Sequence, residues 1–216
     1  MRPLALLGGT FDPIHVGHLR VAWEAAEALD ADLWMLPASV PPHRAAPGAS
    51  AAQRLAMLEA ALLGQQRLRA DPRELRRSGP SYTIDTLCEV RAEIGPQRPL
   101  VLLVGADAFA GLSTWHRWRE LFDHAHIGVL TRPGHGGVFE AELAAEWFTR
   151  RVADAGALRE APAGRILPIE VTPLDVSASA IRALLAEGRS PRYLVPDAAL
   201  AIIEREGIYG VREKNA

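Results

Sequence analysis

The sequence predicts an α/β fold with a doubly wound, mostly parallel sheet and a small C-terminal helical part. Short, continuous apolar runs, typical of strands buried on both faces, alternate with stretches whose apolar residues recur at helical spacing. Such alternation predicts a parallel sheet, because each parallel connection must cross back over the sheet, usually as a helix. A length of 216 residues fits one domain, so we expect a single domain over residues 1–216, with residues 175–216 as its C-terminal helical subregion.

The first strand–helix–strand unit lies at the start of the chain. Residues 4–7 form a continuous apolar run that ends at Gly8 and Gly9. Apolar residues at helical spacing follow between residues 19 and 29, and residues 33–36 form a second apolar run. We therefore expect a right-handed βαβ unit here.

The same alternation continues through the rest of the chain. The expected helices are residues 53–63, 83–94, 140–153, 178–186 and 198–206; the expected strands are residues 100–104, 127–130 and 166–171, with an irregular or edge strand at 68–75. Residues 134–137 and 155–164 are expected to be loops or insertions.

Composition narrows the class of protein. The formal net charge is -2, so no overall field attracts nucleic acid or an anionic membrane. Cys88 is the only cysteine in the sequence, which excludes an internal disulfide and a CxxC metal site. No apolar stretch reaches the length of a membrane span. We expect a cytoplasmic enzyme that binds neither nucleic acid nor membrane, and the sequence leaves its oligomeric state open.

The segment from Gly8 to His18 joins the first strand to the first helix, the position at which open α/β sheets bind ligands. Gly8 and Gly9 let the backbone approach a phosphate, and Gly17 lies where helix N–H groups are unpaired. His15 and His18 are three residues apart, so both project from one side of the first turn. Two donors beside an anion-binding helix end suit the charge that builds on phosphate oxygens during nucleotidyl transfer.

Other interpretations fit this segment less well. The glycine spacing differs from the dinucleotide fingerprint, and the Gly-Lys-Ser/Thr ending of a P-loop is missing. A metal site would need a further ligand beside His15 and His18, and none is convincingly placed, so we expect no protein-bound metal. The role of Asp12 stays open between orienting the glycine loop and touching a solvated metal ion.

A second motif, Val176 to Arg182, leads into the helix expected at 178–186. Ser177 is placed as its N-cap, which leaves neighbouring N–H groups free for an anion. Arg182 offers a fixed positive fork for phosphate oxygens. Two prolines extend the loop that carries His43, which can present this side chain toward the same cleft.

Three further segments predict a site for a second substrate. Thr83 begins a helix, so its hydroxyl and the nearby N–H groups form a donor cluster suited to a carboxylate. Asp107 follows the clearest core strand, where it can accept hydrogen bonds from a sugar hydroxyl. Trp115 can stack on a flat cationic ring, with a cation–π contribution of ~1 kcal/mol. Alternatively, Trp115 and Trp118 both fill gaps in the core.

These motifs together resemble the HxGH nucleotidyltransferase superfamily and, within it, the bacterial nicotinate-nucleotide adenylyltransferase family. The resemblance rests on the segment from Gly8 to His18 and covers nearly the whole chain. The second motif is similar to the family's Ile-Ser-x-Thr-x-x-Arg, with Val176 and Ser179 as departures. His116 stands where some relatives have tyrosine, which leaves the details of stacking open.

The resemblance implies a Rossmann-like fold and a division of the site residues into two groups. The implied catalytic residues are His18, His15 and Arg182. The implied ATP-binding residues are Gly8, Gly9, Thr10, Phe11, His15, His18, His43, Ser177 and Arg182. The implied residues for the second substrate are Tyr82, Thr83, Asp107, Trp115 and Arg132.

The implied reaction transfers AMP from ATP to nicotinic acid mononucleotide, gives nicotinic acid adenine dinucleotide and pyrophosphate, and belongs to NAD biosynthesis. Mg²⁺ is expected to accompany ATP. The alternatives are the same chemistry on nicotinamide mononucleotide or phosphopantetheine, a tRNA-charging fragment and a non-catalytic nucleotide sensor. A pocket lined by donors alone would favour the acid over the amide, because the two amide N–H groups would go unpaired.

Overall fold

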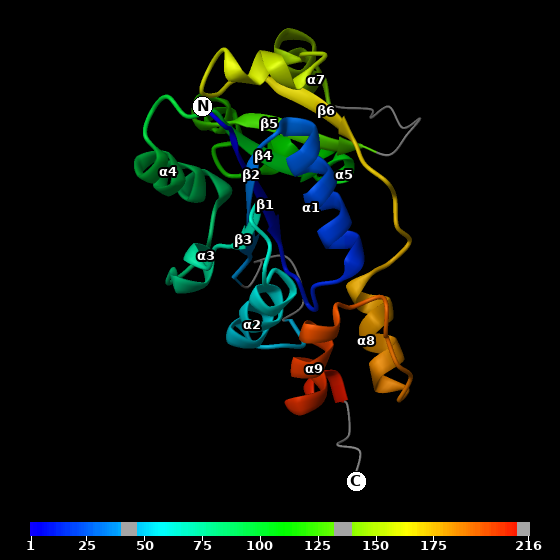
Figure 1. Ribbon diagram of the computed structural model, residues 1–216. Coiled ribbons are helices and arrows are strands. Elements are labelled where there is room, and N and C mark those ends of the chain that lie inside the picture. The colour runs from blue at the N-terminus through cyan, green and yellow to red at the C-terminus, as the bar shows by residue number, and fades with distance from the viewer. Residues whose placement is uncertain (40–46, 132–139, 211–216) are drawn as a thin grey trace.

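A computed structural model describes residues 1–39, 47–131 and 140–210. Its centre is a six-stranded, parallel sheet in the order β3-β2-β1-β4-β5-β6 (Figure 1). The strands are β1 Leu4–Gly9, β2 Asp32–Pro37, β3 Leu68–Ala70, β4 Leu100–Gly105, β5 His126–Thr131 and β6 Ile166–Glu170. The predicted doubly wound parallel sheet is therefore confirmed.

Helices follow the strands in alternation. The longer ones are α1 Val16–Leu29, α2 Ala51–Ala61, α4 Thr83–Ile94, α7 Ala141–Arg150, α8 Ala178–Ala186 and α9 Asp197–Arg205. The short ones are α3 Arg73–Arg76, α5 Ala106–Ala110 and α6 Leu121–His124, with 3-10 turns at Leu112–Thr114, Trp118–Glu120, Ala155–Arg159 and Ile208–Gly210. α4 and α8 have the bounds that the sequence predicts.

Alternation along the strands divides the core between the two faces of the sheet. Ala5 and Leu7 point to one face, into a core cluster that also includes residues of α1, α2, α8 and α9. Leu4 and Leu6 point to the other, beneath α4 to α7. Because both faces are covered, the strands are apolar throughout, and this explains why continuous apolar runs identified them.

Two expected elements differ from the structure. The strand expected at 68–75 ends at Ala70, because the Asp71 carboxylate accepts the N–H of Arg73 at 3.1 Å and begins a helical turn. The helix expected at 140–153 ends at Arg150. There Val152 donates its N–H to the carbonyl of Ile166 at 2.8 Å, so the chain leaves the helix to join the edge of the sheet.

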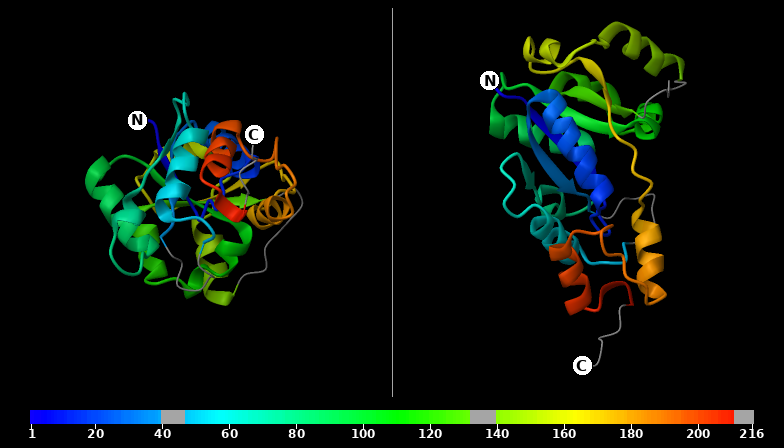
Figure 2. Two further views of the ribbon diagram at one scale, coloured as in Figure 1. Left: turned by 90° about the horizontal axis from the view of Figure 1, so that it is seen from below. Right: turned by 45° about the vertical axis from the view of Figure 1, so that its right-hand side comes forward.

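The C-terminal helices lie at the end of the molecule toward which β1 runs. Residues 171–177 form an extended segment that descends from β6 beside α1 to α8 (Figure 2). Glu24 of α1 fastens this segment, since its carboxylate accepts the N–H and the hydroxyl of Thr172 at 2.6 and 2.7 Å. The second motif is thereby brought to the carboxyl end of the sheet, beside the turn after β1.

Candidate active site

A cavity of about 660 Å³ opens at the carboxyl ends of β1 and β4. These neighbouring strands are where the chain connections diverge, β1 leading to β2 on one side and β4 to β5 on the other. Open α/β sheets bind ligands at such a switch point. Residues from both predicted groups, those for ATP and those for the second substrate, line this cavity. They are Gly8, Gly9, Thr10, Thr83, Asp107 and Trp115.

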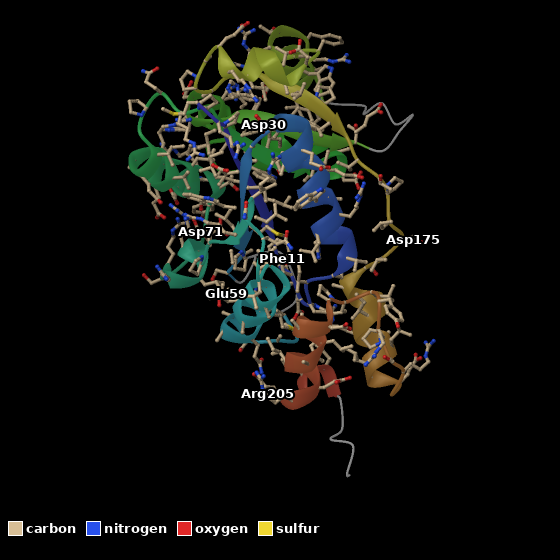
Figure 3. All side chains as sticks on the ribbon, in the orientation of Figure 1. Phe11, Asp30, Glu59, Asp71, Asp175 and Arg205 are labelled. Atoms are coloured by element: carbon tan, nitrogen blue, oxygen red, sulfur yellow. The ribbon has the colours of Figure 1, made fainter. Side chains whose placement is uncertain are left out.

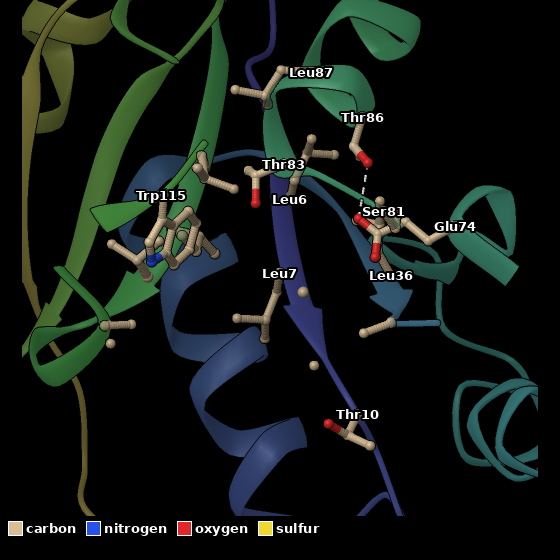
Figure 4. A pocket seen from close by; sticks show the side chains of 18 of the residues that line it. Leu6, Leu7, Thr10, Leu36, Glu74, Ser81, Thr83, Thr86, Leu87 and Trp115 are labelled. Carbon is tan, nitrogen blue, oxygen red and sulfur yellow. Dashed lines mark hydrogen bonds between the residues drawn. The ribbon is translucent and has the colours of Figure 1, made fainter. Parts of the chain in front are cut away.

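The acceptor side of the cavity is formed by α4 and by the segment after β4. Thr83 is the first residue of α4, and no side-chain hydrogen bond caps this end of the helix. Thr83 and Trp115 both line the cavity, alongside β1 (Figure 4). Trp115 is half-buried against the core, whereas Trp118 is only 7% exposed and packs within it. Of the two alternatives that the sequence left open, Trp115 lines the cavity and Trp118 fills the core.

Tyr82 is not among the residues that line the cavity. Its ring lies 4.3 Å from that of His116, with both side chains exposed at the rim. The expected role of Tyr82 in binding the second substrate therefore has no support from the cavity itself.

The turn after β1 is shaped by close packing. A Cβ on Gly9 would lie 2.7 Å from the Phe11 ring, so only glycine fits there. Phe11 has a φ of 50° and is 1% exposed, with its ring edge against His18 at a centroid distance of 5.1 Å (Figure 3). The Phe11 side chain supports the histidine, and any contact with a nucleotide is left to its backbone.

His15 and His18 form a stacked pair at the start of α1. His15 is the N-cap, its Nδ1 lies 3.4 Å from the N–H of His18, and the rings stack at 3.6 Å between centroids. A Cβ on Gly17 would lie 3.0 Å from Nδ1 of His15. A side chain between the histidines would press on the His15 ring, which favours glycine here in addition to its place at a helix end.

Burial keeps both imidazoles neutral at physiological pH. It lowers the pKa of His15 to about 4, and burial together with the neighbouring His15 lowers the pKa of His18 to about 3. Nδ1 of His18 is buried and has no hydrogen-bond partner within the described residues. A buried polar atom without a partner is unusual, and a bound ligand is one way to satisfy it.

Arg182 joins the second motif to the first. Its Nη1 donates to the carbonyl of Asp12 at 2.7 Å, and its Nη2 donates to the hydroxyl of Ser179 at 3.2 Å. Ser177 is the N-cap of α8, as predicted, and its hydroxyl accepts the N–H of Ala180 at 3.2 Å. Two segments more than 160 residues apart in the sequence therefore meet beside the histidine pair.

Asp12 is the centre of the contacts around this turn. Its carboxylate accepts the N–H groups of Gly48 and Ala49 at 2.8 and 3.0 Å and the hydroxyl of Tyr209 at 2.7 Å. It is almost fully buried. Because both oxygens accept hydrogen bonds from other segments, Asp12 orients the loops around it.

Arg54 is a further residue of this region that sequence analysis did not identify. It is 1% exposed, and its Nη1 donates to the carbonyls of Thr10 and Ala38 at 2.7 and 2.8 Å. Arg54 thereby ties together the residues that follow β1 and β2. The helical periodicity of α2 could have identified it. Arg54 lies three and four residues before the buried Met57 and Leu58, and therefore on the same buried face of the helix.

Glu74 on α3 is a second residue that the sequence did not identify, and it lines the cavity. Its carboxylate accepts the hydroxyl of Thr86 at 2.9 Å, and burial raises its pKa. The expectation of an acceptor pocket lined by donors alone is therefore wrong. The region was expected to be an irregular strand, which gave no reason to place this side chain at a site.

His43 and Arg132 lie outside the described residues. Within the described ranges no group of three or more histidine, cysteine, aspartate or glutamate side chains is arranged to hold a metal ion. In the same ranges, the helices lack the combination of length and apolarity that crossing a membrane requires.

Comparison with known proteins identifies the family. The family described as Cytidylyltransferase-like matches residues 6–184. Relatives from Pseudomonas aeruginosa strain UCBPP-PA14 and Pseudomonas syringae pv. tomato, both named "Probable nicotinate-nucleotide adenylyltransferase", are 54% and 50% identical. The alignments cover 95% and 96% of this chain and 96% and 94% of the relatives. The chain belongs to the nicotinate-nucleotide adenylyltransferase family.

A solved structure shares the fold of this nicotinate-nucleotide adenylyltransferase family member. It is the Plasmodium falciparum nicotinic acid mononucleotide adenylyltransferase complexed with NaAD, with a TM-score of 0.71. The two chains are 15% identical, and the match covers 98% of this chain and 99% of the other. At that identity the likeness shows the arrangement of sheet and helices, which is the Rossmann-like architecture predicted from the sequence.

Proposed function

We propose that this protein is a nicotinate-nucleotide adenylyltransferase, which transfers AMP from ATP to nicotinic acid mononucleotide in NAD biosynthesis. The observation that carries the proposal is one cavity in which the glycine turn of β1 meets Thr83, Asp107 and Trp115, beside a neutral histidine pair. The family supports the choice of substrates, and a solved structural relative is named as a complex with NaAD.

The proposed reaction is a direct displacement. The 5′-phosphate of the acceptor attacks the α-phosphorus of ATP, a new P–O bond forms, and pyrophosphate leaves as its bond to the α-phosphorus breaks. The enzyme supplies positioning and charge stabilisation and needs no nucleophile of its own. His18 donates to the α-phosphate as charge develops, with His15 holding its ring in place. Ser177, Arg182 and His43 bind the outer phosphates.

The acceptor would lie across the cavity. Trp115 stacks on the pyridinium ring, Thr83 and the first N–H groups of α4 bind its carboxylate, and Asp107 accepts a sugar hydroxyl. Arg132 assists in binding the acceptor. Mg²⁺ would enter with the triphosphate and neutralise charge on it, held chiefly by phosphate oxygens and water, because the Asp12 carboxylate is engaged by hydrogen bonds. A cytoplasmic location and a single domain with a helical C-terminal subregion remain predictions.

Nicotinamide mononucleotide is the second candidate acceptor, and the Glu74 carboxylate is the observation that supports it. A carboxylate in the cavity wall can accept the amide N–H groups that a pocket of donors would leave unpaired.

Pyrophosphate release with ATP and magnesium tests the proposal. Nicotinic acid mononucleotide and nicotinamide mononucleotide would be compared at matched concentrations, with a reaction lacking acceptor as the control. We expect strong preference for the acid. Equal use would retain the adenylyltransferase and overturn the acid selectivity, whereas no release with either would overturn the proposed function and direct the search to other phosphorylated acceptors.

A further inference from the structure

The charged side chains that line the cavity share one sign. Among the described lining residues these are Glu74 and Asp107, both acidic. A nicotinate nucleotide carries negative charge on its phosphate and carboxylate, and its only positive charge is on the pyridinium ring. Two carboxylates in the wall therefore complement the charge of the ring, whereas they would repel the charged phosphate and carboxylate of the acceptor.

Glu74 lies in the cavity wall without an ion pair among the described residues. Its contact with protein is the hydroxyl of Thr86, which donates to it at 2.9 Å. The nearest cation in this network, Arg77, donates to Ser81 at 2.6 Å, to Thr86 at 3.2 Å and to Glu89 at 2.7 Å. Arg77 therefore acts on Glu74 through its charge, without a direct hydrogen bond or ion pair to it among the described residues.

Burial makes an unpaired carboxylate costly. Desolvation raises the pKa of Glu74, with Asp71 and Glu89 acting in the same direction and Arg77 and the Thr86 hydroxyl opposing them. A positively charged ring in the cavity would relieve this cost. An uncharged ring would leave the carboxylate without a countercharge, and a negatively charged ring would be repelled. Figure 4 shows Glu74 and Trp115 on opposite sides of the cavity, with Thr83 between them.

We infer that Glu74 is a specificity-determining residue, whose carboxylate selects acceptor nucleotides with a positively charged ring. The inference rests on the proposed function and deepens it. Trp115 presents a π face with the same preference for a cation, so the ring would lie between an indole and a carboxylate that both stabilise its charge. Selection by ring charge is separate from selection between acid and amide, because both of those nucleotides carry a pyridinium.

Glu74→Gln tests this assignment cleanly. Glutamine keeps the volume and an oxygen that can accept the Thr86 hydroxyl, and it removes the charge. We expect the KM for nicotinic acid mononucleotide to rise about tenfold while the KM for ATP stays unchanged. A change of about tenfold is the size expected for one charge interaction that solvent screens in an open cavity. Glu89→Gln is the matched control: it makes the same change in the same network, on an exposed residue that does not line the cavity, and should leave both constants unchanged.

A second measurement uses the unaltered enzyme. The inhibition constant of the acid nucleotide with its ring reduced to the neutral dihydropyridine should be at least about tenfold weaker than the affinity for the oxidised form. In Glu74→Gln that difference should shrink. This measurement keeps the inference testable if the variant fails to fold.

The outcomes separate the inference from the proposed function. No pyrophosphate release by the unaltered enzyme would overturn the function and, with it, the inference. Normal turnover with equal binding of both ring states, or a Glu74→Gln variant with an unchanged KM, would overturn the inference alone. If Thr86→Val raised the KM for the acceptor while Glu74→Gln did not, Glu74 would be a positioning residue acting through Thr86, and selection by its charge would be discarded.

Discussion

The two ends of the site are built differently. At the phosphate end, segments far apart in the sequence are tied together, since Asp12 joins residues 48 and 49 to Tyr209 and Arg182. At the acceptor end, the contacts are local, and Glu74, Thr86 and their neighbours all lie within residues 74–89. Asp12 and His15 at the phosphate end are buried, whereas the acceptor end is an open cavity.

The difference indicates that the two ends of the site have separate tasks, which are stabilising charge at the phosphates and binding and releasing the acceptor. Charge develops at the phosphates, so donors there are effective when they are fixed in advance and shielded from water. The acceptor must enter, bind and leave, which an open cavity with half-buried walls permits. We therefore expect changes at the phosphate end to reduce turnover or stability, and changes at the acceptor end to reduce acceptor affinity.

The largest expected effect tests the phosphate end directly. His18→Ala removes the unpartnered imidazole and should lower turnover by at least ~100-fold, with the thermal unfolding midpoint little changed. Steady-state kinetics and thermal unfolding would measure both. His124→Ala, on α6 beside Cys88, is the control and should keep normal turnover. Near-normal turnover in His18→Ala would remove His18 from the mechanism.

Asp12→Asn should lower the free energy of unfolding by about 2 kcal/mol, because an amide NH₂ would replace an oxygen that accepts N–H or O–H groups. The KM for ATP should rise more than the KM for the acceptor. Urea unfolding and kinetics are the measurements. Asp175→Asn, on the exposed segment before α8, provides the same chemical change as a control. Equal stability of the two variants would contradict the central role of Asp12.

Substituting the two tryptophans separately sharpens the comparison at the acceptor end. Trp115→Ala should raise the KM for the acceptor about tenfold and leave the KM for ATP unchanged, since it removes stacking at a cavity wall. Trp118→Ala should instead lower the free energy of unfolding by ~3 kcal/mol or more, because that ring fills the core. A variant at position 115 that weakened ATP more than the acceptor would refute the stacking assignment.

The smallest expected effect concerns pH. The pKa of His15 falls from 6.5 when unfolded to about 4 in the fold, so the unfolded chain binds more protons between these values. The free energy of unfolding should therefore fall as the pH drops from 6.5 toward 4, and His126, whose pKa burial also lowers, adds to the loss.

His15→Asn keeps a residue that can cap α1 and removes the titration. Urea unfolding at pH 7 and pH 5 should show a smaller loss of stability in this variant than in the unaltered protein. An equal loss in both would show that His15 is not held neutral by burial.

Much of the acceptor end and the fold could be predicted from the sequence because their signals are local. Apolar runs identified the strands, and the helix predicted to begin at Thr83 is α4, which begins at that residue. Asp107 was expected from its position after the core strand, and Trp115 from its capacity to stack on a flat cationic ring and from the family resemblance. Both line the cavity. Glu74 was missed because the helical turn around it depends on a hydrogen bond that the Asp71 carboxylate accepts from the N–H of Arg73, and the apolar pattern of residues 68–75 indicated a strand instead.

The sequence by itself determined the parallel sheet, the glycine turn, the histidine pair and the cap at Ser177, since each depends on residues a few positions apart. Only the tertiary structure decided what Asp12, Arg54 and Tyr209 do, and which tryptophan faces the cavity. Those roles require partners between 16 and 197 residues away, brought together by the crossovers of the sheet and the return of α8 and α9 to the end of β1. Local periodicity carries no information about such partners, because burial and pairing over these distances are properties of the packed fold.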